Sequence, residues 1–189
     1  MHHRYALFAL AALACGFASA APPTPAMLTN SCAGCHGIGG ASAGPSMPNL
    51  AGHSKEAIVE AMKKFKSGER PSTLMGRLAK GYTDAEFAAM GDYYSKQKPH
   101  TPKQSLDSAK VARGAAIEGA SCAGCHPDSG RRSFGEVPAL AGQWLPYLQM
   151  QMQMFVAGTR KMPEPMAQQV KALSATDIDS LMHFYASVK

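Results

Sequence analysis

The chain has 189 residues, which is enough for one ordinary domain or two small ones. Only 7% of the residues are aromatic, and the formal net charge of +6 is not gathered into a long Lys/Arg block or a basic stretch with interleaved aromatic residues. This composition excludes nucleic acid as an expected partner.

Residues 1–20 have the pattern of a secretory signal peptide. The basic start "MHHR" is followed by an apolar run from Tyr5 to Leu13 and by the small-residue triplet "ASA" at 18–20. The apolar run is too short to cross a bilayer. We therefore expect a cleaved signal and a periplasmic protein without stable membrane insertion. A buried or disordered amino-terminal helix is the alternative interpretation.

Two short stretches repeat the same six letters. The stretch "SCAGCHGIGG" occupies residues 31–40, and "SCAGCHPDSG" occupies residues 121–130. Apart from Cys15 in the predicted signal, every cysteine lies in one of these motifs, so none remains for a structural disulfide elsewhere. The four remaining cysteines are Cys32, Cys35, Cys122 and Cys125.

The repeat extends well beyond the cysteines. When residue i is laid over residue i+90, "PNLAG" at 48–52 falls on "PALAG" at 138–142, and "FKSGER" at 65–70 falls on "FVAGTR" at 155–160. A stretch rich in Lys, Pro and Gln separates the copies and is typical of a linker. The predicted organisation is a signal at 1–20, a first domain at 21–98, a linker at 99–106 and a second domain at 107–189.

Each copy is predicted to be helical, and neither contains a strand signal. Residues 54–66 and 143–155 are free of internal glycine, as helices require. "TDAE" at 83–86 and "SATD" at 174–177 are capping boxes that open the last helix of each copy. A unit of about eighty residues with long Gly/Pro-rich loops cannot bury much apolar area alone. We therefore expect a large apolar group to complete each core.

The residue after each cysteine pair decides what the motif binds. C-x-x-C serves as a zinc half-site, a dithiol redox switch or a haem attachment site. Zinc would need two more ligands per site, and a dithiol switch would need a βαβ context that this pattern lacks. In C-x-x-C-H, two thiols add to the two vinyl groups of one porphyrin, and the adjacent imidazole ligates the iron. We predict two covalently attached haem c groups, bound by Cys32, Cys35, Cys122 and Cys125, with His36 and His126 as proximal iron ligands.

The distal iron ligand is predicted to be methionine, whose thioether favours Fe(II) and raises the reduction potential. The chain has ten other methionines, so position within the repeat has to select the ligands. Met75 lies 43 residues after Cys32, and Met166 lies 44 residues after Cys122. We assign Met75 and Met166 as distal ligands, with Met162 as the rival in the second copy.

Two further repeated pairs are candidates for supporting roles. Pro48 and Pro138 open the shared "P-x-L-A-G", and their carbonyls could accept a hydrogen bond from the proximal histidine; an ordinary loop proline is the alternative. Arg70 and Arg160 end the shared "F-x-x-G-x-R" and could pair with haem propionates. A solvated surface arginine is equally compatible with the pattern.

The motifs together carry a family resemblance. Each copy resembles a small all-α class I cytochrome c, with C-x-x-C-H, then "P-x-L-x-G", then a distal methionine before the last helix. The tandem pair resembles di-haem cytochromes c. More narrowly, four stretches are similar to the cytochrome subunit of flavocytochrome c sulfide dehydrogenase: "MLTNSCAGCHG" (27–37), "FKSGERPSTLMGRLAKGY" (65–82), "AGQWLPYLQ" (141–149) and "FYAS" (184–187).

This resemblance implies an electron-transfer subunit in the periplasm. A separate flavoprotein subunit would oxidise sulfide and pass electrons from its FAD to the two haems, which would deliver them to a soluble acceptor. The chain itself would have no sulfide-oxidising site. Two alternatives remain: a free-standing di-haem carrier that serves a terminal oxidase, and a haem enzyme in which a distal methionine dissociates to admit substrate.

Overall fold

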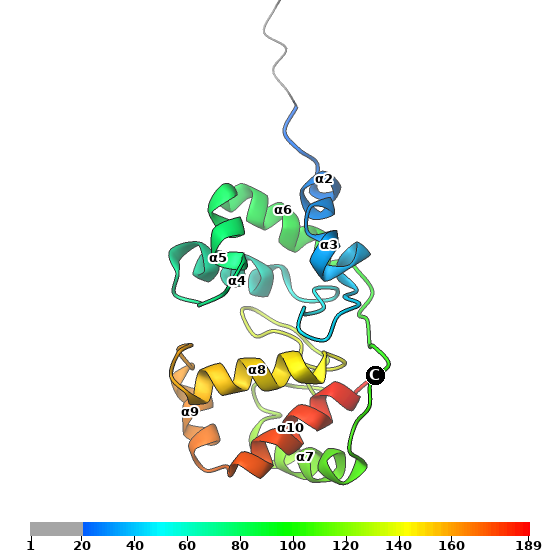
Figure 1. Ribbon diagram of the computed structural model, residues 1–189, viewed down its shortest axis with the longest axis vertical. Coiled ribbons are helices and arrows are strands. Elements are labelled where there is room, and N and C mark those ends of the chain that lie inside the picture. Colours follow the sequence, from blue (N-terminus) through cyan, green and yellow to red (C-terminus); the bar gives the residue numbers. More distant parts are fainter. Residues whose placement is uncertain (1–20) are drawn as a thin grey trace, which may run out of the picture.

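The computed structural model describes residues 21–189, so the predicted signal at 1–20 lies outside the described residues. Figure 1 shows two groups of helices stacked on one another and joined by an extended segment. The first module contains α2 (Pro25–Asn30), α3 (Ala33–His36), α4 (Lys55–Ser67), α5 (Met75–Leu78) and α6 (Asp84–Ser95), with short 3-10 turns at Ile38–Gly40 and Ala79–Gly81. The second module contains α7 (Ser108–Ser121), α8 (Leu145–Val156), α9 (Glu164–Lys171) and α10 (Ala175–Ser187).

The helical prediction is confirmed, and in residues 21–189 the only β pairing is one isolated bridge between Phe134 and Val137. Both predicted capping boxes are present. The Thr83 side chain accepts from the Glu86 amide while Glu86 accepts from the Thr83 amide, and Ser174 and Asp177 do the same at α10. Each box satisfies two amides that the first helical turn would otherwise leave without partners.

Helix α7 is the main element that the sequence did not predict. Its sequence "SAKVARGAAIEGAS" has two glycines and few large apolar residues, so its hydrophobic period is weak. Asp107 caps it by accepting from the amides of Ala109 and Lys110. The helix is stabilised mainly by packing on α10, where Gly114 lets the two backbones approach closely.

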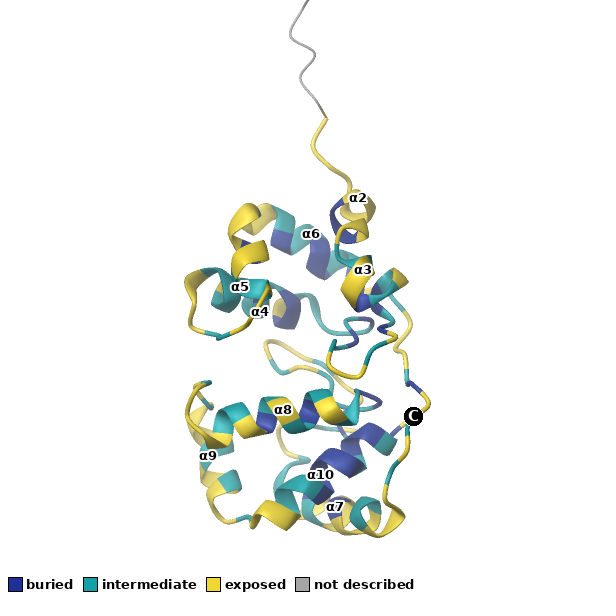
Figure 2. Cartoon of the chain, in the orientation of Figure 1, coloured by how far each residue is buried: buried dark blue, intermediate teal, exposed yellow. Residues whose placement is uncertain are grey.

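The buried apolar residues form two separate clusters, one in each module (Figure 2). The first lies between α2, α4 and α6, and the second lies between α7, α8 and α10. The first cluster is Leu28, Ile58, Met62, Ala79, Phe87, Met90 and Tyr94. The second is Leu148, Met152, Leu181, Met182, Tyr185 and Ala186. The boundaries of the two predicted domains stay a prediction.

A hydrogen-bonded seam joins the modules. The Asn49 amide donates to Gln143 Oε1 over 2.9 Å, and Gln143 Nε2 donates back to the Asn49 carbonyl over 3.1 Å. Both residues are buried. Gln104, in the predicted linker, donates to the carbonyls of Gln143 and Ala186, so the linker is packed into the seam. Among residues 21–189, no helix is long and apolar enough to cross a membrane.

Candidate functional site

The first cysteine motif forms one tight helical turn. The His36 amide donates to the Cys32 carbonyl over 2.9 Å, so His36 shares one turn with Cys35 on α3 and with Cys32, which precedes that helix. His36 is buried, and its Nδ1 lies 2.9 Å from the Pro48 carbonyl. Because a carbonyl can only accept, Nδ1 carries the hydrogen, and Nε2 of the neutral ring keeps its lone pair. The expected role of the Pro48 carbonyl is confirmed.

Burial keeps this imidazole neutral. Desolvation lowers the pKa of His36 below its usual value, and the hydrogen bond to Pro48 opposes that shift only in part. A neutral imidazole with a free Nε2 lone pair is the form that ligates a metal. Its Nδ1 partner fixes the ring orientation and increases the basicity of Nε2.

The second motif has the same local hydrogen bonds but a different environment. The His126 amide donates to the Cys122 carbonyl over 2.9 Å, as in the first motif. However, His126 Nδ1 is buried and finds no partner among the described residues. The expectation for Pro138 is therefore wrong. The next residue, Ala139, donates its amide to His53 of the first module, so this part of the loop is bonded to the seam.

An apolar cavity lies beside the second motif. Its lining includes Cys122, Cys125, His126 and Met166, while Met162 is not among the lining residues. Leu140, Val170, Leu173, Leu181 and Tyr185 complete most of the apolar wall. Two free thiols, a neutral imidazole, a thioether and an apolar wall are the donor set and surroundings that a covalent porphyrin requires, so the residues fit the predicted group.

Met75 has the corresponding position in the first module. It is the first residue of α5 and packs against the first apolar cluster. The segment that follows α5 is tied to the cysteine motif, because the Tyr82 hydroxyl lies 3.0 Å from the Ser31 hydroxyl. The structure therefore places Met75 in the same small core as the motif that contains His36. Its role as iron ligand, like that of Met166, stays a prediction.

The two repeated arginines meet at the seam. Arg70 Nη2 donates to the Tyr147 hydroxyl and to Gln151 Oε1, over 2.9 and 3.0 Å. Arg160 Nη1 donates to the same Gln151 oxygen over 2.6 Å. Each guanidinium also stacks on the phenylalanine five positions before it, with centroid distances of 4.6 and 4.2 Å. Neither arginine is a solvated surface residue.

This arrangement concentrates positive charge where the modules touch. Burial, together with the neighbouring Arg70 charge, lowers the pKa of Arg160 to about 10. Two like charges in a partly buried site favour a carboxylate partner. The porphyrin propionates expected from the sequence are such carboxylates, and the pairing of both arginines at one place is a feature that the repeat alone did not predict.

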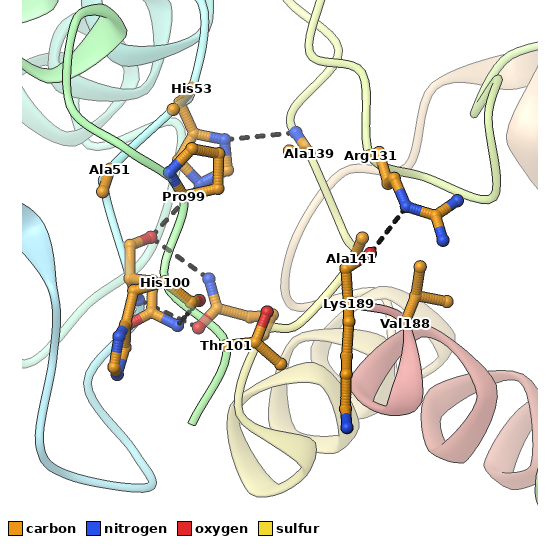
Figure 3. Close-up of a pocket in the computed structure, with 13 residues that line it drawn as sticks. Ala51, His53, Pro99, His100, Thr101, Arg131, Ala139, Ala141, Val188 and Lys189 are labelled. Carbon is orange, nitrogen blue, oxygen red and sulfur yellow. Dashed lines mark hydrogen bonds between the residues drawn. The ribbon is translucent and has the colours of Figure 1, made fainter. Parts of the chain in front are cut away.

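Three other histidines within residues 21–189 lack a repeat partner, and two of them are structural. His53 lies in the seam, with Nδ1 accepting from the Ala139 amide and Nε2 donating to the Asn49 carbonyl (Figure 3). His183 is buried in the second module and accepts from the Asp107 amide. Within residues 21–189, no three His, Cys, Asp or Glu side chains cluster as a zinc site would require.

Both a family model and individual proteins match this chain. A family model described as Cytochrome c matches residues 25–98. Cytochrome c-552 of Acidithiobacillus ferridurans is 31% identical over 174 residues, which cover 82% of this chain and 75% of that protein. The thiosulfate dehydrogenase electron acceptor of Thiomonas intermedia is 33% identical over 153 residues, which cover 75% of this chain and 68% of that protein.

This chain is also similar to one relative over a shorter stretch and to a solved structure. The cytochrome subunit of sulfide dehydrogenase of Chlorobaculum tepidum is 47% identical over 68 residues, which cover 36% of this chain and 61% of that protein. The crystal structure of reduced recombinant cytochrome c4 from Pseudomonas stutzeri superimposes with a TM-score of 0.74 at 25% identity, covering 85% of this chain and 95% of that one.

Proposed function

The chain belongs to the cytochrome c family, with two tandem class I domains and two covalently bound haem c groups, and we propose that it accepts electrons from a sulfur-oxidising dehydrogenase in the periplasm. The donor that we propose first is an FAD-containing sulfide dehydrogenase flavoprotein, bound as a heterodimer. The chain then passes the electrons to a soluble acceptor.

We propose the same set of roles for the haem-binding residues of each module. Cys32 and Cys35 would hold the first haem by thioether bonds, and His36 and Met75 would ligate its iron. In the second module, Cys122 and Cys125 would form the bonds, and His126 and Met166 would ligate the iron. Haem supplies one-electron redox chemistry, while the protein supplies ligands, burial and a docking surface. Saturated irons leave no open position for substrate, which suits electron transfer.

The meeting of Arg70 and Arg160 on one glutamine is the observation that most supports a two-centre path. Arginines that bind the propionates of both haems at one seam would direct the two carboxylate edges toward each other. The reciprocal hydrogen bonds of Asn49 and Gln143 would hold that arrangement fixed. An electron that enters one module can then leave from the other.

The choice of donor rests on the relatives. The match to the sulfide dehydrogenase subunit has the higher identity but covers about a third of this chain. The match to the thiosulfate dehydrogenase electron acceptor is weaker in identity but covers three quarters of it. Thiosulfate dehydrogenase is therefore the second candidate donor. Both candidates require the same chemistry from this chain.

Purification of the native protein from its source periplasm tests the proposal. We expect co-elution with a flavin-containing subunit and sulfide-dependent reduction of both haems, with dithionite giving the full reduction amplitude as a reference. Thiosulfate with a thiosulfate dehydrogenase fraction forms the parallel assay. If only the thiosulfate assay reduces the haems, thiosulfate dehydrogenase replaces the flavoprotein as the proposed donor. Isolation as a flavin-free carrier that neither system reduces would overturn the proposal.

A further inference from the structure

A buried carboxyl group lies next to the second cysteine motif. Glu118, on α7, is only 6% exposed, and its Oε1 has no hydrogen-bond partner among the described residues. It stands four positions before Cys122, and its backbone carbonyl accepts from the amides of Cys122 and Ala123 over 2.9 and 3.0 Å. The backbone of Glu118 is thus bonded directly to the turn that carries the haem attachment site. Burying a polar group without a partner is costly, so its presence requires an explanation.

The first module provides a matched comparison. Leu28 stands four positions before Cys32, is 7% exposed and belongs to the first apolar cluster. Glu118 therefore takes the place that leucine has in the other copy. The tyrosines nearby also correspond, since Tyr94 lies beside Cys32 and Tyr185 lies beside Cys122. At this position, the second module has replaced a core leucine by an ionisable group.

Within residues 21–189, no cation pairs with the Glu118 carboxyl. In the same part of the chain, the buried Tyr185 hydroxyl on the opposing helix α10 also has no hydrogen-bond partner, and the Cys122 sulfur is the other polar neighbour. His126 stacks edge-on against Tyr185 with ring centroids 6.0 Å apart. The charged groups that join α7 to α10 are already paired with each other, nearer the start of α7: Lys110 with Asp179, and Arg113 with Asp177. His183, on α10, accepts from the Asp107 amide.

We propose that Glu118 binds a proton when the second haem is reduced and releases it when that haem is oxidised, which makes the second haem the pH-dependent centre of the pair. This inference rests on the proposed electron-transfer function. When one electron reduces the second haem from Fe(III) to Fe(II), one proton passes from solvent to the Glu118 carboxylate. The net charge of the site then stays constant.

The physical reason is electrostatic. An oxidised haem carries one more positive charge than a reduced one, and this charge favours the carboxylate form of a nearby acid. Burial raises the pKa of Glu118 above its ordinary value, because desolvation disfavours the carboxylate and no cation offsets it. This direction favours the protonated carboxyl, which is also the form that a reduced haem nearby would favour. The apolar Leu28 gives the first haem no such group.

Redox titration of the purified di-haem protein at a series of pH values tests this inference. A Met75→His background, in which the first haem loses its potential-raising ligand, separates the two titration waves. We expect the potential of the second haem to fall as pH rises. The limiting slope is about 59 mV per tenfold change in proton concentration for a one-electron couple. Glu118→Gln and Glu118→Leu should flatten this slope, while the first haem is unchanged.

A control variant and a second readout make the test specific. Glu56→Gln removes an exposed carboxylate on the first turn of α4 and should leave both titrations as they were. A reduced-minus-oxidised infrared spectrum should show a protonated carboxyl band that Glu118→Gln removes. An equal pH slope in wild type and Glu118→Gln, or a flat wild-type titration, would overturn the inference. Since no donor protein is used, either result is independent of the proposed partner.

Discussion

The two proximal histidines have identical sequence neighbours at the cysteine motif but unequal surroundings. His36 donates its Nδ1 hydrogen to the Pro48 carbonyl, while His126 Nδ1 is buried and has no hydrogen-bond partner among the described residues. A carbonyl partner increases the basicity of a ligating imidazole. We therefore expect the two irons to be held by ligands of different donor strength. A second difference between the two sites is that Glu118 takes the place that Leu28 has in the first module.

The methionine assignment gives a prediction for single residues. Met166 lines the apolar cavity with His126, whereas Met162 does not, so Met166→Leu should remove one of the two methionine–iron bonds. The absorption band near the red end of the visible spectrum that reports this bond in the oxidised protein should fall to about half. The near-isosteric Met162→Leu should keep the full band. Loss of half the band in Met162→Leu instead would reverse the assignment.

The second module is held together mainly by the packing of α7 against α10. A Cβ added at Gly114 would lie 2.2 Å from the Ser180 carbonyl oxygen and 2.7 Å from Phe184 Cβ, so only glycine permits this approach. The helix that contains this glycine also carries Glu118 and ends at Ser121, directly before Cys122. The spacing of the two helices therefore affects both the core and the haem attachment site.

Two alanine substitutions on one helix test this contact. Gly114→Ala should lower the free energy of unfolding by about 1–3 kcal/mol, because the added methyl group forces α7 away from α10. Gly119→Ala, where nothing lies within 4 Å, should be neutral or stabilising by up to about 1 kcal/mol. Denaturant unfolding of the two holoproteins measures both values. Equal stability of the two variants would show that the helices can separate without cost.

The seam joins the two modules, and it contains the partly buried imidazole of His53. Burial is the main reason that the pKa of His53 falls from 6.5 to about 4. The hydrogen bond that His53 Nδ1 accepts also favours the neutral ring, as the lowered pKa does. Nδ1 accepts from the Ala139 amide, so a proton on Nδ1 would face another N–H group; Figure 3 shows this hydrogen bond as a dashed line.

Stability should therefore depend on pH through this residue. Unfolded His53 binds a proton near pH 6.5 and the folded protein binds it only near pH 4, so acid in this interval favours unfolding. The free energy of unfolding should fall by about 3 kcal/mol from this group as pH drops from 6.5 to 4. His53→Gln should remove this part of the pH profile, and the exposed His100→Gln should not. Denaturant titrations at several pH values measure the difference; identical profiles for wild type and His53→Gln would refute the assignment.

The sequence by itself determined the local chemistry and the repeat. Cys-x-x-Cys-His fixes its ligands within one turn, capping boxes act over three residues, and an internal copy can be aligned without any structure. These are short-range relations, so residue spacing is sufficient to find them. The helical class of the fold and the two covalent haem groups followed from them.

Only the tertiary structure decided the long-range relations. Helix α7 forms because α10 packs on it, which weak local periodicity could not reveal. The convergence of Arg70 and Arg160, the unpartnered Nδ1 of His126 and the burial of Glu118 all depend on residues that are distant in sequence. Burial and hydrogen bonding are set by whichever groups the fold brings together. For that reason, two copies with the same motif became two unequal sites.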